Sequence, residues 1–256
     1  MRAESLSGRD WRDAAAYAPL LCADRSLFAW EWLRRDCAYR AAWSSACSAG
    51  GAAQHAAAAT FGLVAFEPPH LAVPDARPLW RREVHPYVLP TEASGRGGSA
   101  DCFDVERLGP LRRLAAVDGC EHLLLSDGLR AVRLDAPRGT FTAGPVRLGY
   151  SLAGLASAEP PLLALRRFLA LCRTGRFAAS LHPRQARARR WILLLRAFDA
   201  LEQGADQRRI AGELLSPSAG ETRWRTREPS VRSQAQRLVR AARRMAGGGY
   251  RELLLG

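Results

Sequence analysis

The residues best suited to chemistry with another molecule are arginines near the C-terminal end of the 256-residue sequence. The stretch PSVRSQAQRLVRAARRMAGGGY spans 229–250 and contains five arginines and no acidic residue. They are Arg232, Arg237, Arg240, Arg243 and Arg244. A guanidinium keeps its charge at any working pH, and its fork of N–H donors fits phosphate oxygens. These residues indicate a surface for a polyanion, unless they form only a solvated helix face.

The same stretch has the pattern of a two-faced helix at about 100° per residue. The apolar stripe is Val231, Ala235, Leu238, Ala242 and Met245, and the opposite face is Ser233, Gln236, Arg237, Arg240, Arg243 and Arg244. Pro229 suits the start of a helix, and the glycines at 247–249 end it. A solvated face usually mixes charge signs, because opposite charges four residues apart attract. Here like charges repel one another, and a phosphate partner would offset that repulsion.

Arginine, glutamine and serine are also side chains that read base edges in the major groove of DNA. We therefore predict that the first turns of this helix meet bases and that its later arginines meet phosphates. Arginines just before the helix extend the basic surface. The predicted DNA-binding residues are Arg225, Arg227, Ser230, Arg232, Ser233, Gln236, Arg237, Arg240, Arg243 and Arg244.

Two preceding helices are expected to position this one. Residues 189–201 carry an apolar stripe that includes Trp191 and Phe198. The segment GADQRRIAGELL at 204–215 then supplies a glycine turn, Asp206 as N-cap and a small Ala211 on which a third helix can pack. This order predicts a helix-turn-helix, although the gap from 215 to 229 is longer than its usual turn of three or four residues.

The net positive charge of the chain is concentrated in its last third. All 38 basic residues are arginines, and the net charge is +13. Residues 161–256 hold 20 arginines against 7 acidic residues, whereas residues 1–160 hold 18 of each. A basic domain joined to a neutral one indicates a polyanion reader fused to a part with another role.

The N-terminal part is rich in aromatic residues. Four of the seven tryptophans, Trp11, Trp30, Trp32 and Trp43, fall within residues 10–48. We expect a helix from about residue 27 to 46, capped by Ser26 and apolar on both sides. Such a helix is either the core of a compact domain or an interface with a second copy or another partner.

The middle of the chain has the pattern of strands. Asp127-Gly128 lies between two apolar runs, which is a strong hairpin signal. The pattern also indicates strands in 79–90 and 144–155 and a loop at 92–101. Together with the hairpin, these strands predict a small antiparallel sheet. The fold class is therefore α+β. The predicted domains are a helical 1–48, a β-rich 60–155 and a helical, basic 156–256, of which 60–256 could form one unit.

Catalytic and metal-binding patterns are absent from the sequence. The five histidines are dispersed, and Cys120 and His122 have no second pair to complete a tetrahedral metal site. The spacing GxSxxG at 149–154 is not that of a serine nucleophile, and no phosphate-binding loop occurs. We predict no enzyme, no metal and no cofactor.

The sequence also indicates in which part of the cell the protein is found. It has neither a signal peptide nor a run of about 20 apolar residues that could span a membrane. We therefore predict a cytoplasmic, nucleoid-associated protein without membrane contact. Its six cysteines are expected to be reduced thiols, several of them in the core.

Several of these segments together resemble a known family. LLRAFDALEQGADQRRIAGELL at 194–215, a tryptophan in the following loop, and SVRSQAQRLVRAARRMAGGGYRELL at 230–254 resemble the C-terminal DNA-binding domain of RovC-type transcription factors. That domain also occurs in FseA activators and QseM antiactivators of integrative conjugative elements. CEHLLLSDGLRAVRLD at 120–135 is similar to the domain's upstream half, and residues 11–43 resemble the transcriptional-regulator-like domain fused to it in FseA-like proteins. Asp206 stands where the family has a serine cap, and both residues cap helices.

The resemblance implies a bacterial DNA-binding transcriptional regulator, an activator of genes of a mobile element or a type six secretion locus. Its expected partners are double-stranded DNA, further copies of itself, and another transcription regulator or RNA polymerase. The alternative is a protein-binding antiactivator that uses the same fold to sequester a regulator. The separate aromatic N-terminal part favours the activator, because an antiactivator would need only the C-terminal part. We expect residues 1–48 to serve docking or self-association.

Overall fold

A computed structural model describes residues 8–46, 50–96, 101–217 and 229–255 of the chain. The helical elements are η1 Ala15–Cys22, α1 Arg25–Leu33, α2 Cys37–Ala46, α3 Gly51–Ala59, η2 Val105–Leu111, α4 Glu159–Thr174, α5 Ala188–Glu202, α6 Gln207–Leu214, α8 Pro229–Ala246, η4 Gly249–Arg251 and α9 Glu252–Leu255. The strands are β1 Leu63–Ala65, β2 Leu79–Trp80, β3 Val88–Arg96, β4 Cys102–Phe103, β5 Arg112–Val117, β6 Cys120–Ser126, β7 Ala131–Arg138 and β8 Val146–Tyr150. The predicted α+β class is confirmed.

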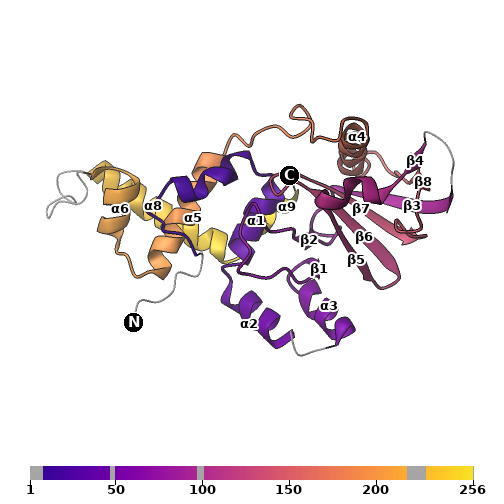
Figure 1. Ribbon diagram of the computed structural model, residues 1–256. Coiled ribbons are helices and arrows are strands. Elements are labelled where there is room, and N and C mark those ends of the chain that lie inside the picture. Colours follow the sequence, from indigo (N-terminus) through magenta and orange to yellow (C-terminus); the bar gives the residue numbers. More distant parts are fainter. Residues whose placement is uncertain (1–7, 47–49, 97–100, 218–228, 256) are drawn as a thin grey trace.

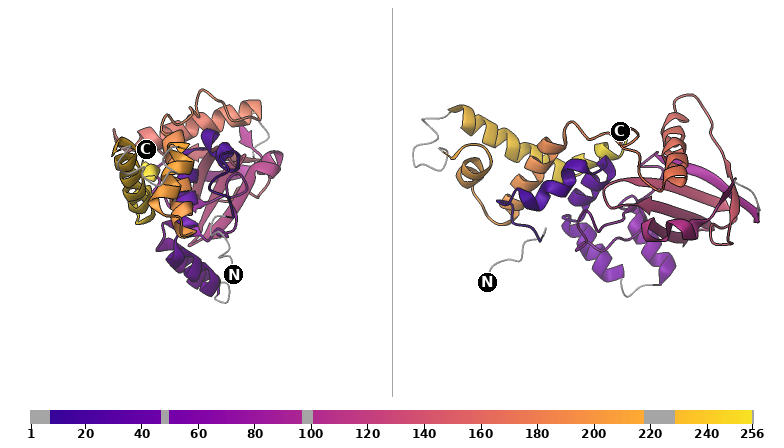
Figure 2. Two further views of the ribbon diagram at one scale, coloured as in Figure 1. Left: turned by 90° about the vertical axis from the view of Figure 1, so that its left-hand side faces the viewer. Right: turned by 45° about the horizontal axis from the view of Figure 1, so that its top comes forward.

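The molecule is elongated (Figures 1 and 2). The sheet and α4 lie at one end, α6 and the start of α8 lie at the other, and α1 lies between them. None of the described helices is long and apolar enough to cross a membrane.

The sheet has six strands in the order β4-β8-β3-β7-β6-β5, and a separate antiparallel pair joins β1 to β2. Neighbours in the larger sheet are antiparallel except β3 and β7, which run parallel. The predicted hairpin is confirmed: β6 pairs with β7, and the Asp127 carboxylate accepts the backbone N–H groups of Leu129 and Arg130 in the turn. Gly128 has a φ of 91°, and a Cβ there would lie 2.1 Å from the Pro74 carbonyl oxygen. Only glycine fits this turn.

Helix α4 covers one face of this sheet (Figure 1). Phe168 and Leu171 of α4 are buried together with Leu89 of β3 and Leu134 of β7. Gly175 ends α4 as its C-cap in the left-handed conformation that glycine adopts readily, with a φ of 66°. This apolar layer holds the sheet and α4 together as one unit.

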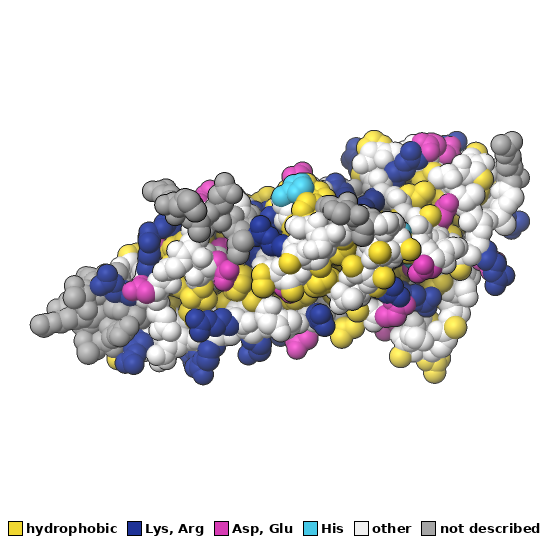
Figure 3. Space-filling model, turned by 90° about the horizontal axis from the view of Figure 1, so that it is seen from below, with side chains coloured by type: hydrophobic (Ala, Val, Ile, Leu, Met, Phe, Trp, Pro, Cys, Tyr) yellow, Lys and Arg dark blue, Asp and Glu magenta, His cyan; other side chains and the backbone are white. Residues whose placement is uncertain are grey.

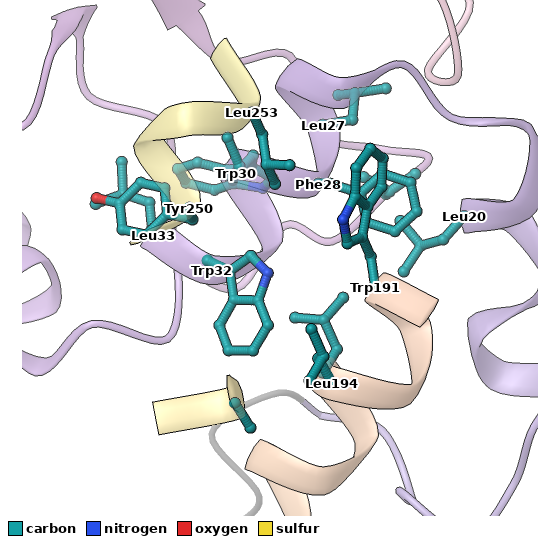
Figure 4. Close-up of a cluster of buried hydrophobic side chains, with 14 of the residues drawn as sticks. Leu20, Leu27, Phe28, Trp30, Trp32, Leu33, Trp191, Leu194, Tyr250 and Leu253 are labelled. Atoms are coloured by element: carbon teal, nitrogen blue, oxygen red, sulfur yellow. The ribbon is translucent and has the colours of Figure 1, made fainter. Parts of the chain in front are cut away.

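A second and larger core joins the two ends of the chain (Figure 4). Phe28 of α1 packs edge-on against Trp191 of α5, with ring centroids 4.9 Å apart, and Trp32 lies 5.6 Å from Phe198. Tyr250, after α8, completes the same cluster. Of the two interpretations of the aromatic segment, the core helix is the one that the structure shows.

The tryptophans differ in burial, however. Trp11, Trp30 and Trp32 are at most 2% exposed, whereas Trp43 on α2 is only half-buried. Trp191 is buried as predicted, and Phe198 is half-buried against the core.

The prediction of one helix from 27 to 46 is wrong. The chain leaves the helix after Leu33, and α2 starts at Cys37. Asp36 is the cause of the restart, because its carboxylate accepts the backbone N–H of Ala38 at 2.8 Å, as an N-cap side chain does. Ser26 is not the cap of the first helix. That helix begins at Arg25, and Asp24 is in the N-cap position.

The prediction that several cysteines lie in the core is also wrong for the described residues. Cys22, Cys102 and Cys120 are half-buried, and Cys37 and Cys172 are exposed. All five are free thiols, as expected, and Cys47 lies outside the described residues.

Candidate nucleic-acid interface

Helices α5, α6 and α8 form a three-helix group at the end of the molecule away from the sheet (Figure 1). Gly204, with a φ of 76°, turns the chain between α5 and α6. The Asp206 carboxylate then accepts the backbone N–H of Arg209 at 2.8 Å, so the predicted N-cap of α6 is confirmed. These local signals fix the entry of the chain into the second helix of the group.

The contact between α6 and α8 is made by small side chains. Ala211 of α6 and Ala235 of α8 are both 0% exposed and lie in one cluster with Leu215 and Val231. The prediction that Ala211 lets the third helix pack across the second is therefore confirmed. Alanine has no side-chain atoms beyond Cβ, so the two backbones can approach closely.

The apolar stripe of α8 faces the protein as predicted. Ala235, Leu238 and Ala242 are fully buried, and Val231 and Met245 are partly buried. Val239, which the predicted stripe omitted, is also buried at 3% exposure. The glycines after the helix allow the turn into η4, where Gly248 has a φ of 108°.

The opposite face of α8 is open to solvent. The exposed residues among those predicted to bind DNA are Ser230, Arg232, Ser233, Arg237, Arg240, Arg243 and Arg244. Gln236 is half-buried, and Arg225 and Arg227 lie outside the described residues. In the described part of the chain, no ion pair involves an arginine of α8. Figure 3 shows basic side chains exposed along this end of the molecule.

Arginines elsewhere in the chain show a different use of the same residue type. Arg35 is buried between Glu31 and Asp199, and Arg133 is buried against Asp135. Those guanidiniums hold the fold together, whereas the guanidiniums of α8 have no such partner among the described residues and remain available to phosphate.

Two more exposed arginines belong to this end of the molecule and were not predicted as site residues. Arg208 and Arg209 lie on α6, next to the inward-facing Ile210 and Ala211. The sequence carried the signal, because the inward position of Ile210 and Ala211 turns the residues before them outward. The helix order α5, α6, α8 also agrees with a helix-turn-helix, but residues 215–228 separate its last two helices.

The structure adds a third member to the pair Cys120 and His122. The register of β6 and β7 places Asp135 beside His122, with Nδ1 and Oδ1 2.8 Å apart, and the ligand atoms of all three lie within 4.8 Å. Burial alone would raise the pKa of Asp135, but the hydrogen bond from His122 and the charge of Arg133 lower it below its ordinary value.

The chemistry of this cluster is that of an internal ion pair. Arg133 donates to Oδ1 of Asp135 from Nε at 3.0 Å and from Nη2 at 2.8 Å, so the carboxylate already holds a cation. Burial raises the pKa of the Cys120 thiol to about 11, which keeps it protonated near neutral pH. A metal ion at this cluster would have to displace Arg133 from Asp135 and the proton from Cys120.

Comparison with known families places two matches at the two ends of the chain. Residues 156–255 match the family model described as "T6SS, Transcription factor, DNA binding domain", and residues 10–63 match the "Proteobacterial transcriptional regulator-like domain". No curated protein and no solved structure matches the chain. The matches confirm the arrangement that the resemblance implied, and they support a transcription factor with a C-terminal DNA-binding domain.

Proposed function

We propose that this protein is a transcriptional regulator that binds double-stranded DNA with α8 in the major groove. The observation that carries the proposal is the exposed face of α8, on which five arginines have no acidic neighbour in the helix, opposite a buried apolar stripe. Ser230, Arg232, Ser233 and Gln236 come first along the helix and are the candidates for base contacts. Arg237, Arg240, Arg243 and Arg244 are the candidates for phosphate contacts, and Arg225 and Arg227 remain proposed members of the surface.

We also propose which genes the protein regulates and how. Activation of genes of a mobile element or a type six secretion locus agrees with the two family descriptions, one of which names that secretion system. We assign DNA binding to 156–256 and docking or self-association to 1–48, with 60–155 between them. A protein that acts on DNA in bacteria works in the cytoplasm at the nucleoid.

An exposed apolar surface supports a protein partner. Leu162 and Leu169 on α4 are 45% and 43% exposed, and Leu155 just before α4 is 99% exposed. Leu162 and Leu169 are seven residues apart and therefore share one face of α4, and exposed apolar patches are typical of protein contacts. Besides residues 1–48, this surface is a second candidate for contact with another copy of the chain, with another regulator or with RNA polymerase. It would also serve an antiactivator, which would bind a regulator and not DNA.

The test is DNA binding by fluorescence anisotropy across a salt series. Replacing Arg240, Arg243 and Arg244 together with alanine should weaken binding to every duplex and reduce the slope of log K against log salt by about three. The matched control replaces Arg107, Arg166 and Arg173, which are exposed on η2 and α4, and removes the same charge. Equal losses in the two variants would refute a role of α8. No DNA binding by the wild type, with binding to a partner regulator, would favour the antiactivator.

A further inference from the structure

A second group of arginines surrounds a cavity where the first turn of α1, the strands β6 and β7, and the helices α4 and α9 meet. The cavity has a volume of about 280 Å³. Arg25, Arg77, Arg133, Arg167 and Arg184 line it, and Asp24 is the acidic residue of its wall. These arginines come from distant parts of the chain, so the fold brings their charges together.

Among the described residues, four of the five arginines have no carboxylate partner. Arg133 is paired with Asp135, but in the described part of the chain no ion pair involves Arg25, Arg77, Arg167 or Arg184. Neutral oxygens hold three of them. Arg25 donates from Nε to Gln185 Oε1 at 2.8 Å, Arg167 from Nε to the Leu181 carbonyl at 2.9 Å, and Arg77 from Nη1 to the Pro74 carbonyl at 2.6 Å. Each contact positions a guanidinium without neutralising its charge.

Asp24 does not balance this charge. Its Oδ2 accepts the backbone N–H of Ala131 at 3.2 Å and lies 3.3 Å from Nδ1 of His182. Burial lowers the pKa of Arg167, and the charge of Asp24 opposes this effect without cancelling it. Arg167 is therefore a partly desolvated cation whose charge favours a nearby anion.

The rest of the wall has two further properties. The first residues of the nine-residue helix α1 line the cavity, and the N-terminal end of a helix favours an anion. Apolar side chains, among them Leu27, Trp80 and Leu163, line it as well. Apolar walls with a few placed charged groups are typical of small-molecule sites.

We propose that this cavity binds a small organic anion, whose phosphate or carboxylate group meets Arg25, Arg77, Arg167 and Arg184 and whose apolar part meets Leu27, Trp80 and Leu163. The volume limits the ligand to a compact molecule, since ligand pockets usually range from about 300 to 1,000 Å³. The site is distinct from the surface of α8 proposed for DNA. It lies beside Leu253 of α9, which follows α8 in the chain.

The test is isothermal titration calorimetry on the full chain without DNA, at constant ionic strength. The probes are phenyl phosphate, benzoate, inorganic phosphate and the neutral benzyl alcohol. We expect one molecule of phenyl phosphate or benzoate to bind per chain, more tightly than inorganic phosphate and benzyl alcohol. Preference between the two aromatic anions then identifies the ligand as a phosphate or a carboxylate. Failure of both to bind would overturn the proposal.

Substitutions distinguish binding of the anion in the cavity from nonspecific attraction of an anion to a basic protein. Arg167→Met should weaken binding at least about tenfold, because it removes a charge-assisted hydrogen bond. Leu163→Trp should abolish binding by filling the cavity while every charge stays. The triple alanine variant of α8 should bind the probe like the wild type. If Arg167→Met does not fold, the exposed rim variant Arg184→Ala takes its place. Binding that survives Leu163→Trp, or that is lost in the α8 variant, would overturn the proposal.

Discussion

Arg35 forms a bidentate ion pair with Asp199, with Nε 2.7 Å from Oδ1 and Nη2 2.8 Å from Oδ2. Both side chains are buried, and they are 164 residues apart in the chain. Glu31 accepts a hydrogen bond from Nη1 of Arg35 at 2.7 Å, and the Tyr17 hydroxyl donates to Asp199 at 2.5 Å. The N-terminal segment and α5 are therefore joined by a polar network inside their shared aromatic core.

This network predicts a large loss of stability when Asp199 is removed. Asp199→Ala leaves Arg35 with one carboxylate in place of two, and breaking a buried ion pair typically costs about 3–5 kcal/mol. Urea unfolding of the variant and the wild type measures the difference. The control is Asp75→Ala, an exposed carboxylate, which should change the stability by no more than about 0.5 kcal/mol. Similar effects of the two substitutions would contradict the role given to the network.

A pH dependence should follow from His85. Burial lowers the pKa of His85 to about 4 in the folded protein, although its Nδ1 contacts the Leu254 carbonyl at 2.9 Å. The unfolded chain has an ordinary histidine pKa of about 6.5, so between the two values the unfolded state binds the extra proton. Stability should therefore fall as the pH decreases from about 6.5 to about 4, by at most about 3 kcal/mol.

The matched variant for this prediction is His85→Asn, which can donate to the same carbonyl and does not titrate. Its urea midpoint should change less than that of the wild type over the same pH range. The carboxylates contribute at lower pH. Burial would raise the pKa of Glu31, but Arg35, Arg34 and Arg9 lower it below the ordinary value of 4.5, so its contribution is present above that pH and is lost below it. A parallel pH dependence in both proteins would exclude His85 as the cause.

The packing of α6 on α8 can be tested with a larger side chain. Ala235→Leu adds three carbon atoms where Ala235 meets Ala211, both fully buried. Overpacking of this kind should cost about 1–3 kcal/mol. Ala53→Leu on the exposed face of α3 is the control and should be close to neutral. A neutral Ala235→Leu would mean that the two helices are not in close contact.

The sequence predicted the parts of this fold that depend on neighbours in the chain. The Asp206 cap, the hairpin at Asp127-Gly128 and the apolar stripe of α8 follow from spacing and residue type alone. The break between α1 and α2 is also local, but the apolar pattern continues through it. A single capping carboxylate at Asp36 was therefore missed.

The features of the fold that the sequence did not predict depend on contacts between segments that are distant in the chain. Nothing in the sequence pairs Arg35 with Asp199, places Asp135 beside His122 or makes β3 parallel to β7. The arginines of the cavity are likewise scattered from Arg25 to Arg184, with no local pattern. By contrast, the arginines of α8 were found because one helix presents them all.

Two single substitutions on α8 should distinguish base contacts from phosphate contacts. Gln236 is half-buried near the start of the helix, whereas Arg243 is exposed near its end. If Gln236 makes a bidentate contact to a base, Gln236→Ala should reduce discrimination between a selected and a scrambled duplex by about 1–3 kcal/mol. Arg243→Ala should instead weaken binding to both duplexes equally and reduce the salt slope by about one, because it removes one phosphate contact. The measurement is anisotropy with a duplex that the wild type selects from a random library and with its scrambled form. An equal loss on both duplexes for Gln236→Ala would move the base-reading role to Arg232 and Ser233, the exposed side chains one turn earlier.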